Sequence, residues 1–197
     1  MNLSLEQIFA QRRSLRSFSD RAVDRDTIRR LFEAARWASS ARNEQPWHYV
    51  VLDDPASEIR LRVLASMEPH NCVWAEKAPV VLVSVAQLGF RGRDNQNRHA
   101  YHDVGQANAH LALRAAELGL STHIIGGFNA AAAGEALKLP PGFDVVALIA
   151  IGYPGLPDAL PEHLRVREVA PRVRKEIEEF VYFRAWPVLG TDEDRDG

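Results

Sequence analysis

The sequence predicts one layered domain of the α+β or α/β class, spanning residues 1–190. Two continuous apolar runs, at 78–85 and 145–153, are typical of strands buried on both faces of a sheet. Segments with helical spacing of apolar residues alternate loosely with these strands. The chain has no internal repeat and no clear linker, and we expect its charged tail, TDEDRDG (191–197), to be disordered.

The remaining elements follow from the spacing of apolar residues along the chain. Helices are expected at 4–12, from Asp24 or Asp26 to the polar run at 39, at 57–67, at 99–118 and at 130–137. Strands are expected at 49–52, 78–85, 121–125 and 145–153. Residues 89–98 read as a loop or lid, 154–161 as an extended connection, and 177–183 as a late helix or strand.

Several helix ends carry recognisable signals. Ser4 and Gln7 have the spacing of a capping box, and Asn129 is suited to cap the helix that follows it. Gly119 is suited to close the helix at 99–118. Many small residues in that helix permit close packing, so we expect it to lie centrally.

Composition excludes several classes of protein. The net charge of -2 argues against a nucleic-acid or membrane-surface protein. Hydrophobic content of 46% and charged content of 25% are ordinary for a globular protein. Arginines number 21 and lysines 3, so planar guanidinium groups that suit phosphate or carboxylate are abundant. The single Cys72 precludes an internal disulfide. With no signal peptide in its first residues and no apolar run of membrane-spanning length, the chain is expected to be cytoplasmic.

Three polar clusters stand beside structured segments. RRSLR (12–16) can converge on a phosphate, or it is a solvated basic helix end. The run at 39–45 directly precedes a strand; it holds a ligand, or its side chains satisfy their own backbone. In PRVRK (171–175), alternation puts Arg172 and Arg174 on one side of an extended chain, where they bind an anion or form a surface patch.

In their order along the chain, six stretches resemble the nitroreductase family of FMN-dependent oxidoreductases. They are RRSLRSF (12–18), SSARNEQPWHYVV (39–51), KAPVVLVSV (77–85), DVGQANAHLALRAAELGLSTHIIGGFN (103–129), ALIAIGYPG (147–155) and RVRKEIEEFVYFRAW (172–186). The resemblance implies an α+β fold with a central, mostly antiparallel sheet and helices on both faces. It also implies a homodimer with an FMN in a groove at each subunit interface, and NAD(P)H as a transient co-substrate.

Residue by residue, the resemblance implies a cofactor site. The side chains implied at the phosphate, ribityl chain and pyrimidine edge of FMN are Arg12, Arg13, Ser14, Arg16, Arg172 and Arg174. Arg16 is implied at the N1–O2 edge, where a cation stabilises the anionic reduced flavin and tunes its potential. Ser40 and Asn43 would reach the flavin across the dimer interface, with Gln45 supporting their loop.

Two further segments match the family's flavin site. Gly126 and Gly127 would present backbone amides near flavin N5 and O4, where a side chain would hold the ring away, although a plain strand-to-helix turn also needs glycine. Asn71 would face the pyrimidine or ribityl group, or is an ordinary loop residue. Arg42 and His70 are expected to border the substrate pocket, where an arginine favours an anionic substrate.

The chain departs from the family pattern at three places. Residues 38–40 read Ala-Ser-Ser where Ala-Pro-Ser is usual, and Glu176 replaces a usual proline. Trp74 stands where some members carry a lysine near the flavin, so Arg16 alone would supply positive charge there. These departures bear on the substrate class more than on FMN binding.

Other chemistries are less well supported by the sequence. His99, His102 and Asp103 share a helix face, but no second Cys or His cluster stands at ligand spacing, so a structural role is favoured and no metal is expected. There is no Gly-x-Ser-x-Gly, no Gly-x-Gly-x-x-Gly and no Walker loop. Nicotinamide would therefore have no Rossmann site and would alternate with the acceptor at the flavin.

We therefore expect an oxidoreductase that passes hydride from NAD(P)H through FMN to a nitroaromatic, quinone or related small acceptor by a ping-pong mechanism. The flavin carries the chemistry, so no catalytic acid or base of the chain is named. One alternative is a flavin-binding or sequestering protein without efficient turnover. Another is a specialised relative on the same fold, such as a dehalogenase or dehydrogenase.

Overall fold

The computed structural model describes residues 3–186. Its helices are α1 (Leu5–Gln11), α2 (Arg25–Ala35), α3 (Glu58–Ala65), α4 (Pro69–Ala75), α5 (Ala100–Glu117), α6 (Ala130–Leu137) and α7 (Glu162–Val169). Its strands are β1 (Trp47–Leu52), β2 (Val80–Gln87), β3 (Ser121–Ile125) and β4 (Phe143–Gly152). Short 3-10 turns are η1 (Ala41–Asn43), η2 (Pro157–Ala159) and η3 (Ile177–Glu179).

The four strands form one antiparallel sheet in the order β1-β2-β4-β3. In the register of β1 against β2, Trp47 lies opposite Ala86 and Leu52 opposite Val81. The start of β1 therefore lies at the end of the sheet where β2 finishes. This arrangement confirms the α+β fold with an antiparallel sheet.

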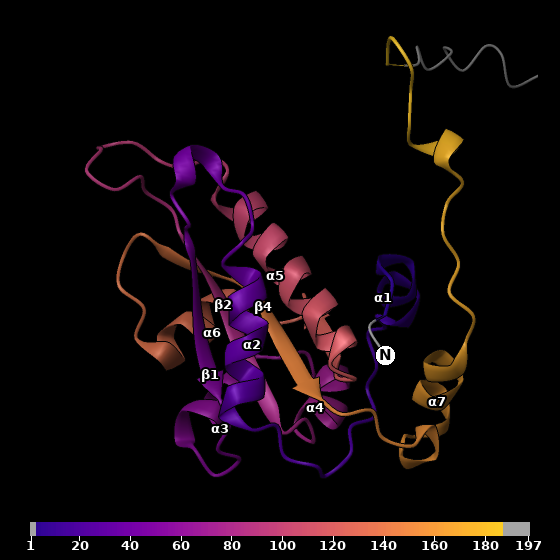
Figure 1. The fold of residues 1–197 in the computed structure, drawn as a ribbon. Helices are drawn as coiled ribbons and strands as arrows, with labels where there is room; N and C mark the ends of the chain where they lie inside the picture. Colours follow the sequence, from indigo (N-terminus) through magenta and orange to yellow (C-terminus); the bar gives the residue numbers. More distant parts are fainter. Residues whose placement is uncertain (1–2, 187–197) are drawn as a thin grey trace, which may run out of the picture.

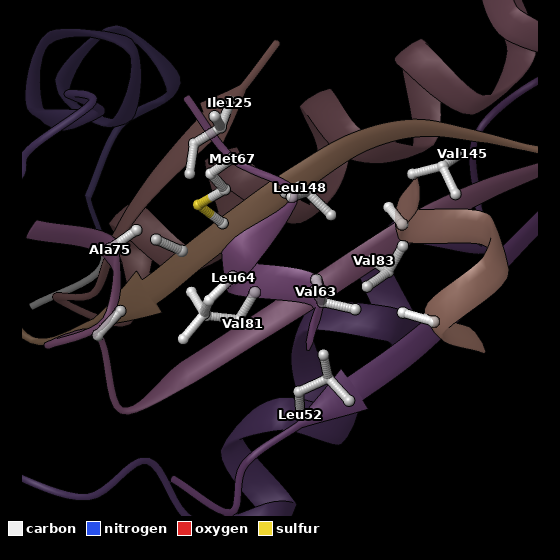
Figure 2. Close-up of a cluster of buried hydrophobic side chains, with 14 of the residues drawn as sticks. Leu52, Val63, Leu64, Met67, Ala75, Val81, Val83, Ile125, Val145 and Leu148 are labelled. Carbon is white, nitrogen blue, oxygen red and sulfur yellow. The ribbon is translucent and has the colours of Figure 1, made fainter. Parts of the chain in front are cut away.

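Helices cover both faces of the sheet, because β2 alternates its side chains between two cores (Figure 1). Val81 and Val83 pack in the core beneath α3 and α6, which Figure 2 shows in close-up. Val80 and Leu82 point to the other core, against α2 and α5. Burial on both faces explains why β2 and β4 are continuously apolar.

The helix-end signals are confirmed. Ser4 and Gln7 form the capping box of α1, with the Ser4 hydroxyl accepting the Gln7 N–H at 3.3 Å. Asp24 caps α2 and Asn129 caps α6. Gly119 follows α5 with a φ of 75°, a left-handed conformation that glycine adopts without steric cost.

Helices α4 and α7 had not been predicted from the sequence. Asn71 and His70 lie on α4, not in a loop, because Pro69 occupies the first turn where its missing N–H costs nothing. Helix α7 begins directly after Pro161, in a stretch for which no element had been predicted. The turn η2 lies inside the segment 154–161, where only an extended connection had been expected.

Other element assignments need smaller corrections. Helix α3 is shorter than 57–67, and it turns Arg60 inward while Ile59 is 46% exposed. Of 177–183, only η3 is regular, because the rest leaves the body of the protein and has no partner strand. Residues 191–197 lie outside the described part of the chain.

The C-terminal arm, residues 171–186, runs from α7 past α1 and away from the sheet (Figure 1). Its large apolar side chains are exposed, including Phe180 at 58%, Phe183 at 86% and Trp186 at 76%. Such exposure is rare on a monomer and is typical of an interaction surface. Within residues 3–186, the helices are too short or too polar to span a membrane.

Candidate functional site

Guanidinium groups from the two ends of the chain line one cleft beside α1. Arg12 ends α1, and Arg172 and Arg174 come from the C-terminal arm; with Phe9 and Ala10 they line a cleft of about 650 Å³. Burial, and then repulsion from Arg172 and Arg174, lower the pKa of Arg12. Because its lining residues bring three cations and no carboxylate, the cleft favours an anion such as a phosphate.

Arg172 also fastens the arm to α1. Its Nη1 donates to the main-chain oxygens of Arg12 at 2.6 Å and Phe9 at 3.3 Å, and its Nη2 donates to the oxygen of Ala10. These are carbonyls at the C-terminal end of a helix, where a cation is also favoured by the helix dipole. Ser14 lies beside the cleft, accepting a hydrogen bond from Arg12 at 3.4 Å.

The other two arginines of the N-terminal cluster face α7. Arg13 donates to the main-chain oxygens of Glu168 at 2.9 Å and Ala170 at 2.8 Å, so its guanidinium caps α7 and does not line the cleft. Arg16 forms an ion pair with Glu168 at 3.7 Å, and its guanidinium carbon lies 6.0 Å from the ring centroid of Trp74.

Helix α4 carries the next group of candidates. Asn71 donates from Nδ2 to the main-chain oxygen of Gly127 at 3.2 Å, which joins α4 to the turn after β3. A Cβ added at Gly127 would lie 2.7 Å from Asn71 Nδ2. A Cβ added at Gly126 would meet nothing within 4 Å, so protein packing does not require glycine there. His70 pairs with Glu68 at 3.5 Å on the exposed side of the helix.

Trp74 and His123 form an aromatic wall next to Arg16. The Trp74 ring is buried, and its centroid lies 4.4 Å from that of His123. His123 Nδ1 lies 3.0 Å from the main-chain oxygen of Leu15, which accepts its hydrogen. Burial, the largest cause, lowers the pKa of His123 to about 4, so this ring is neutral at pH 7. Trp74 Nε1 is a buried donor without a partner among the described residues.

The loop at 39–45 satisfies part of its own hydrogen bonding. The Ser40 hydroxyl accepts the Gln45 N–H at 3.0 Å, and Gln45 Nε2 donates to Asn43 Oδ1 at 3.2 Å. Arg42, Asn43 and Gln45 have φ values of 57°, 56° and 52°. Left-handed backbone at three non-glycine residues is strained, and such strain is concentrated at functional sites.

Two side chains of helix α5 support this loop through hydrogen bonds. Ser39 donates to Gln106 at 2.6 Å, and the Ala41 N–H donates to the buried carboxylate of Asp103 at 3.0 Å. Asp103 therefore has the structural role expected for it, since its carboxylate holds the loop.

The described residues contain no group of three or more His, Cys, Asp or Glu side chains placed to hold a metal ion.

The 89–98 segment contacts the loop through two residues, Arg91 and Phe90. Arg91 donates from its backbone N–H to Glu44 Oε1 at 2.9 Å, and from Nη2 to the main-chain oxygen of Glu44 at 2.8 Å. The guanidinium of Arg42 lies over the ring of Phe90, 5.9 Å from its centroid. The segment is a short turn closed by a bridge between Gly89 and Gln96.

The candidate residues fall into two groups at opposite ends of the sheet. The loop at 39–45 precedes Trp47, whereas α4 precedes Val80, which lies beside the end of β1. Six strand residues span about 17 Å, so the two groups do not meet in one chain. In Figure 1, η1 lies at one end of the sheet and α4 lies near the other end. Arg42 and His70, expected together at a substrate pocket, are in different groups.

The first group contains the residues at 12–16, 70–74, 126–127 and 172–174, and its chemistry fits FMN. The arginine-lined cleft matches a phosphate monoester. The open space at Gly126 would admit a planar ring close to backbone, and the unpartnered Trp74 Nε1 leaves a buried donor nearby. No residue of this group rules the cofactor out.

Comparison with known proteins agrees with this chemistry. The model of the nitroreductase family matches residues 9–69 and 53–153, so the chain belongs to that family. An NADH dehydrogenase of Thermus thermophilus is 32% identical over 184 residues, covering 78% of this chain and 87% of that protein. An iodotyrosine deiodinase of Haliscomenobacter hydrossis is 26% identical over 195 residues, covering 85% and 86%. A crystal structure of an FMN-containing oxidoreductase superposes with a TM-score of 0.86 at 28% identity, covering 95% of each chain.

Sequence reasoning missed several residues of the site. Glu168 lies in α7, which the sequence had not indicated, and nothing in the local pattern ties it to Arg16. His123 and Arg91 read as an ordinary strand residue and a loop residue. Asp103 was noted only as part of a possible metal cluster, since its partner Ala41 is far away along the chain.

Proposed function

We propose that the chain is an NAD(P)H-dependent oxidoreductase with FMN as its cofactor, passing hydride to a nitroaromatic, quinone or related small acceptor by a ping-pong mechanism. Family membership and the similarity to an FMN-containing oxidoreductase support this proposal. The observation that carries it is the cleft in which Arg12, Arg172 and Arg174 converge.

Bound FMN supplies the hydride chemistry, and the chain supplies position and charge. Arg12, Arg172 and Arg174 hold the phosphate end. Arg16 supplies positive charge beside the flavin ring. Asn71 holds the turn at Gly127 through its hydrogen bond to the Gly127 oxygen. The open position at Gly126 keeps the backbone accessible to the ring.

The working unit we propose is a homodimer. One chain separates the 39–45 loop from the arginine cleft, so a site using both groups needs a second copy. The C-terminal arm carries exposed aromatic side chains suited to such an interface. Ser40, Asn43 and Gln45 of one copy would then complete the site of the other, with Arg42 near the acceptor. Residues 1–190 would form one domain of each subunit.

The test uses the purified full-length chain supplied with FMN. We expect a bound-flavin absorbance spectrum, oxidation of NADH or NADPH with nitroaromatic or quinone acceptors, and parallel double-reciprocal plots. Absence of both flavin and oxidation refutes the proposal. Tight FMN without anaerobic reduction by NAD(P)H supports the sequestering alternative instead.

The similarity to an iodotyrosine deiodinase favours one second candidate, reductive dehalogenation of a halogenated aromatic. The short turn at 89–98 offers less cover than the extra lid expected of such enzymes. Iodide release from an iodinated tyrosine, compared with reduction of a nitroaromatic at equal enzyme concentration, separates the two.

A further inference from the structure

Glu168 is a buried carboxylate that the proposed function has not used. It is 5% exposed and lies near the end of α7. Its Oε1 accepts the backbone N–H groups of Arg16 at 2.8 Å and Ser17 at 2.9 Å. Carboxylates this well buried are uncommon unless they are paired and hydrogen-bonded.

The second oxygen of Glu168 faces the side chain of Arg16. Oε2 lies 3.7 Å from Arg16 Nη1, which is an ion pair but too long for a hydrogen bond. It has no hydrogen-bond partner within residues 3–186. One oxygen is therefore committed to the backbone, and the other acts on Arg16 through its charge.

Arg16 is held between this carboxylate and an aromatic ring. Its guanidinium carbon lies 6.0 Å from the Trp74 centroid, and its side chain is only 17% exposed. Burial and the nearby Arg167 lower the pKa of Arg16, whereas Glu168 acts in the opposite direction. In such a site the screening by water is weak, so a charge at 3.7 Å has a large effect.

The backbone contacts alone do not require a negative charge. A glutamine at this position would offer its amide oxygen to the N–H groups of Arg16 and Ser17. Arg13 also ties the segment to α7 through main-chain oxygens of Glu168 and Ala170, which a side-chain change leaves in place. What the carboxylate adds is its charge beside Arg16.

We propose that Glu168 is a positioning residue that directs Arg16 and partly offsets its charge at the flavin ring, which holds down the reduction potential of bound FMN. The inference rests on the proposed function, which puts Arg16 beside the ring. Neutralising Glu168 leaves Arg16 less compensated, so the negatively charged reduced flavin is favoured. Glu168→Gln is expected to tighten binding of reduced relative to oxidised FMN about tenfold, a rise of about 30 mV for a two-electron couple.

The test measures the midpoint potential of FMN bound to wild type, Glu168→Gln, Arg16→Gln and the double variant, by anaerobic equilibration with a reference dye at saturating FMN. Glu162→Gln is the matched control, because it removes the same charge from the exposed side of the same helix. We expect a rise in Glu168→Gln and none in Glu162→Gln. Once Arg16 is glutamine, Glu168→Gln should produce a clearly smaller rise, because only the direct field of the carboxylate is then removed.

Each other outcome has a defined meaning. A rise of the same size in the Arg16→Gln background, or no rise at all, overturns the inference. If Glu168→Gln does not fold, Glu168→Asp keeps the charge but withdraws it from Arg16, and a smaller rise is expected; failure of both variants to fold makes Glu168 purely structural and also overturns it. Wild-type protein that binds no FMN refutes the proposed function itself.

Discussion

Arg172 donates a hydrogen bond to the main-chain oxygen of Arg12 at 2.6 Å, although 160 positions separate the two residues. Two more carbonyls of α1 accept from the same guanidinium. The contact closes one wall of the cleft proposed to hold the FMN phosphate. It therefore couples the end of the first helix to the C-terminal arm.

Replacing Arg172 should weaken FMN binding. Arg172→Ala removes a cation from the cleft and the cap from α1, so the Kd for FMN is expected to rise at least about tenfold. Arg172→Lys should recover little, because an ammonium lacks the fork that spans several carbonyls. Quenching of FMN fluorescence measures the Kd, with exposed Arg30→Ala as the control. Wild-type affinity in Arg172→Ala would contradict the phosphate assignment.

The two glycines after β3 should respond differently to alanine. Gly126→Ala introduces a methyl group into open space, so the free energy of unfolding should change little while FMN affinity falls. Gly127→Ala should displace the Asn71 side chain and cost about 1 kcal/mol of stability. Urea unfolding and FMN titration are measured on both variants. Unchanged FMN affinity in Gly126→Ala would count against a ring lying there.

Arg60 should be essential to stability and not to flavin chemistry. It is 1% exposed and donates to the main-chain oxygens of Leu52, Glu76, Ala78 and Pro79. Arg60→Met leaves these carbonyls without their donor and should cost about 3 kcal/mol or more in urea unfolding. Arg62→Met, on the exposed side of α3, is the matched control. Equal stability of the two variants would refute this role.

His123 should make stability depend on pH. Its folded pKa is about 4 against 6.5 for a free imidazole, so between these values only the unfolded chain binds the proton. Stability should therefore fall as pH drops from 6.5 to 4, by up to about 3 kcal/mol from this group. His123→Asn should reduce that dependence in urea unfolding at pH 7 and pH 5. Exposed His163→Asn is the control, and an identical pH dependence in both variants would exclude His123 as the cause.

The arm should hold two copies together. Replacing Phe180 and Phe183 by serine removes exposed aromatic area that a dimer would bury, so the protein should shift toward monomer in light scattering and lose FMN affinity. Ile59→Ser with Leu61→Ser on α3 is the control, since these side chains are 46% and 54% exposed. A monomeric wild-type protein that still binds FMN would refute the dimer proposal.

Sequence alone determined the elements whose signals are local. The cap at Ser4 and the helix between Asn129 and Leu137 rest on neighbours within one turn, and the run at 78–85 is apolar because both of its faces are covered. The two caps are formed by residues within one turn of each other, and the run at 78–85 shows its burial in its own composition. The resemblance to the nitroreductase family likewise rests on motifs in a fixed order along the chain, and it does not depend on which residues are in contact.

Tertiary structure decided which candidates meet and which do not. Arg13 and Arg16 are near neighbours in sequence, yet one caps α7 and the other faces Glu168 and Trp74. The antiparallel register puts the 39–45 loop and the residues around α4 at opposite ends of β1, a strand about 17 Å long. Such pairings depend on how separate elements pack against one another, and no local pattern specifies the distance between them.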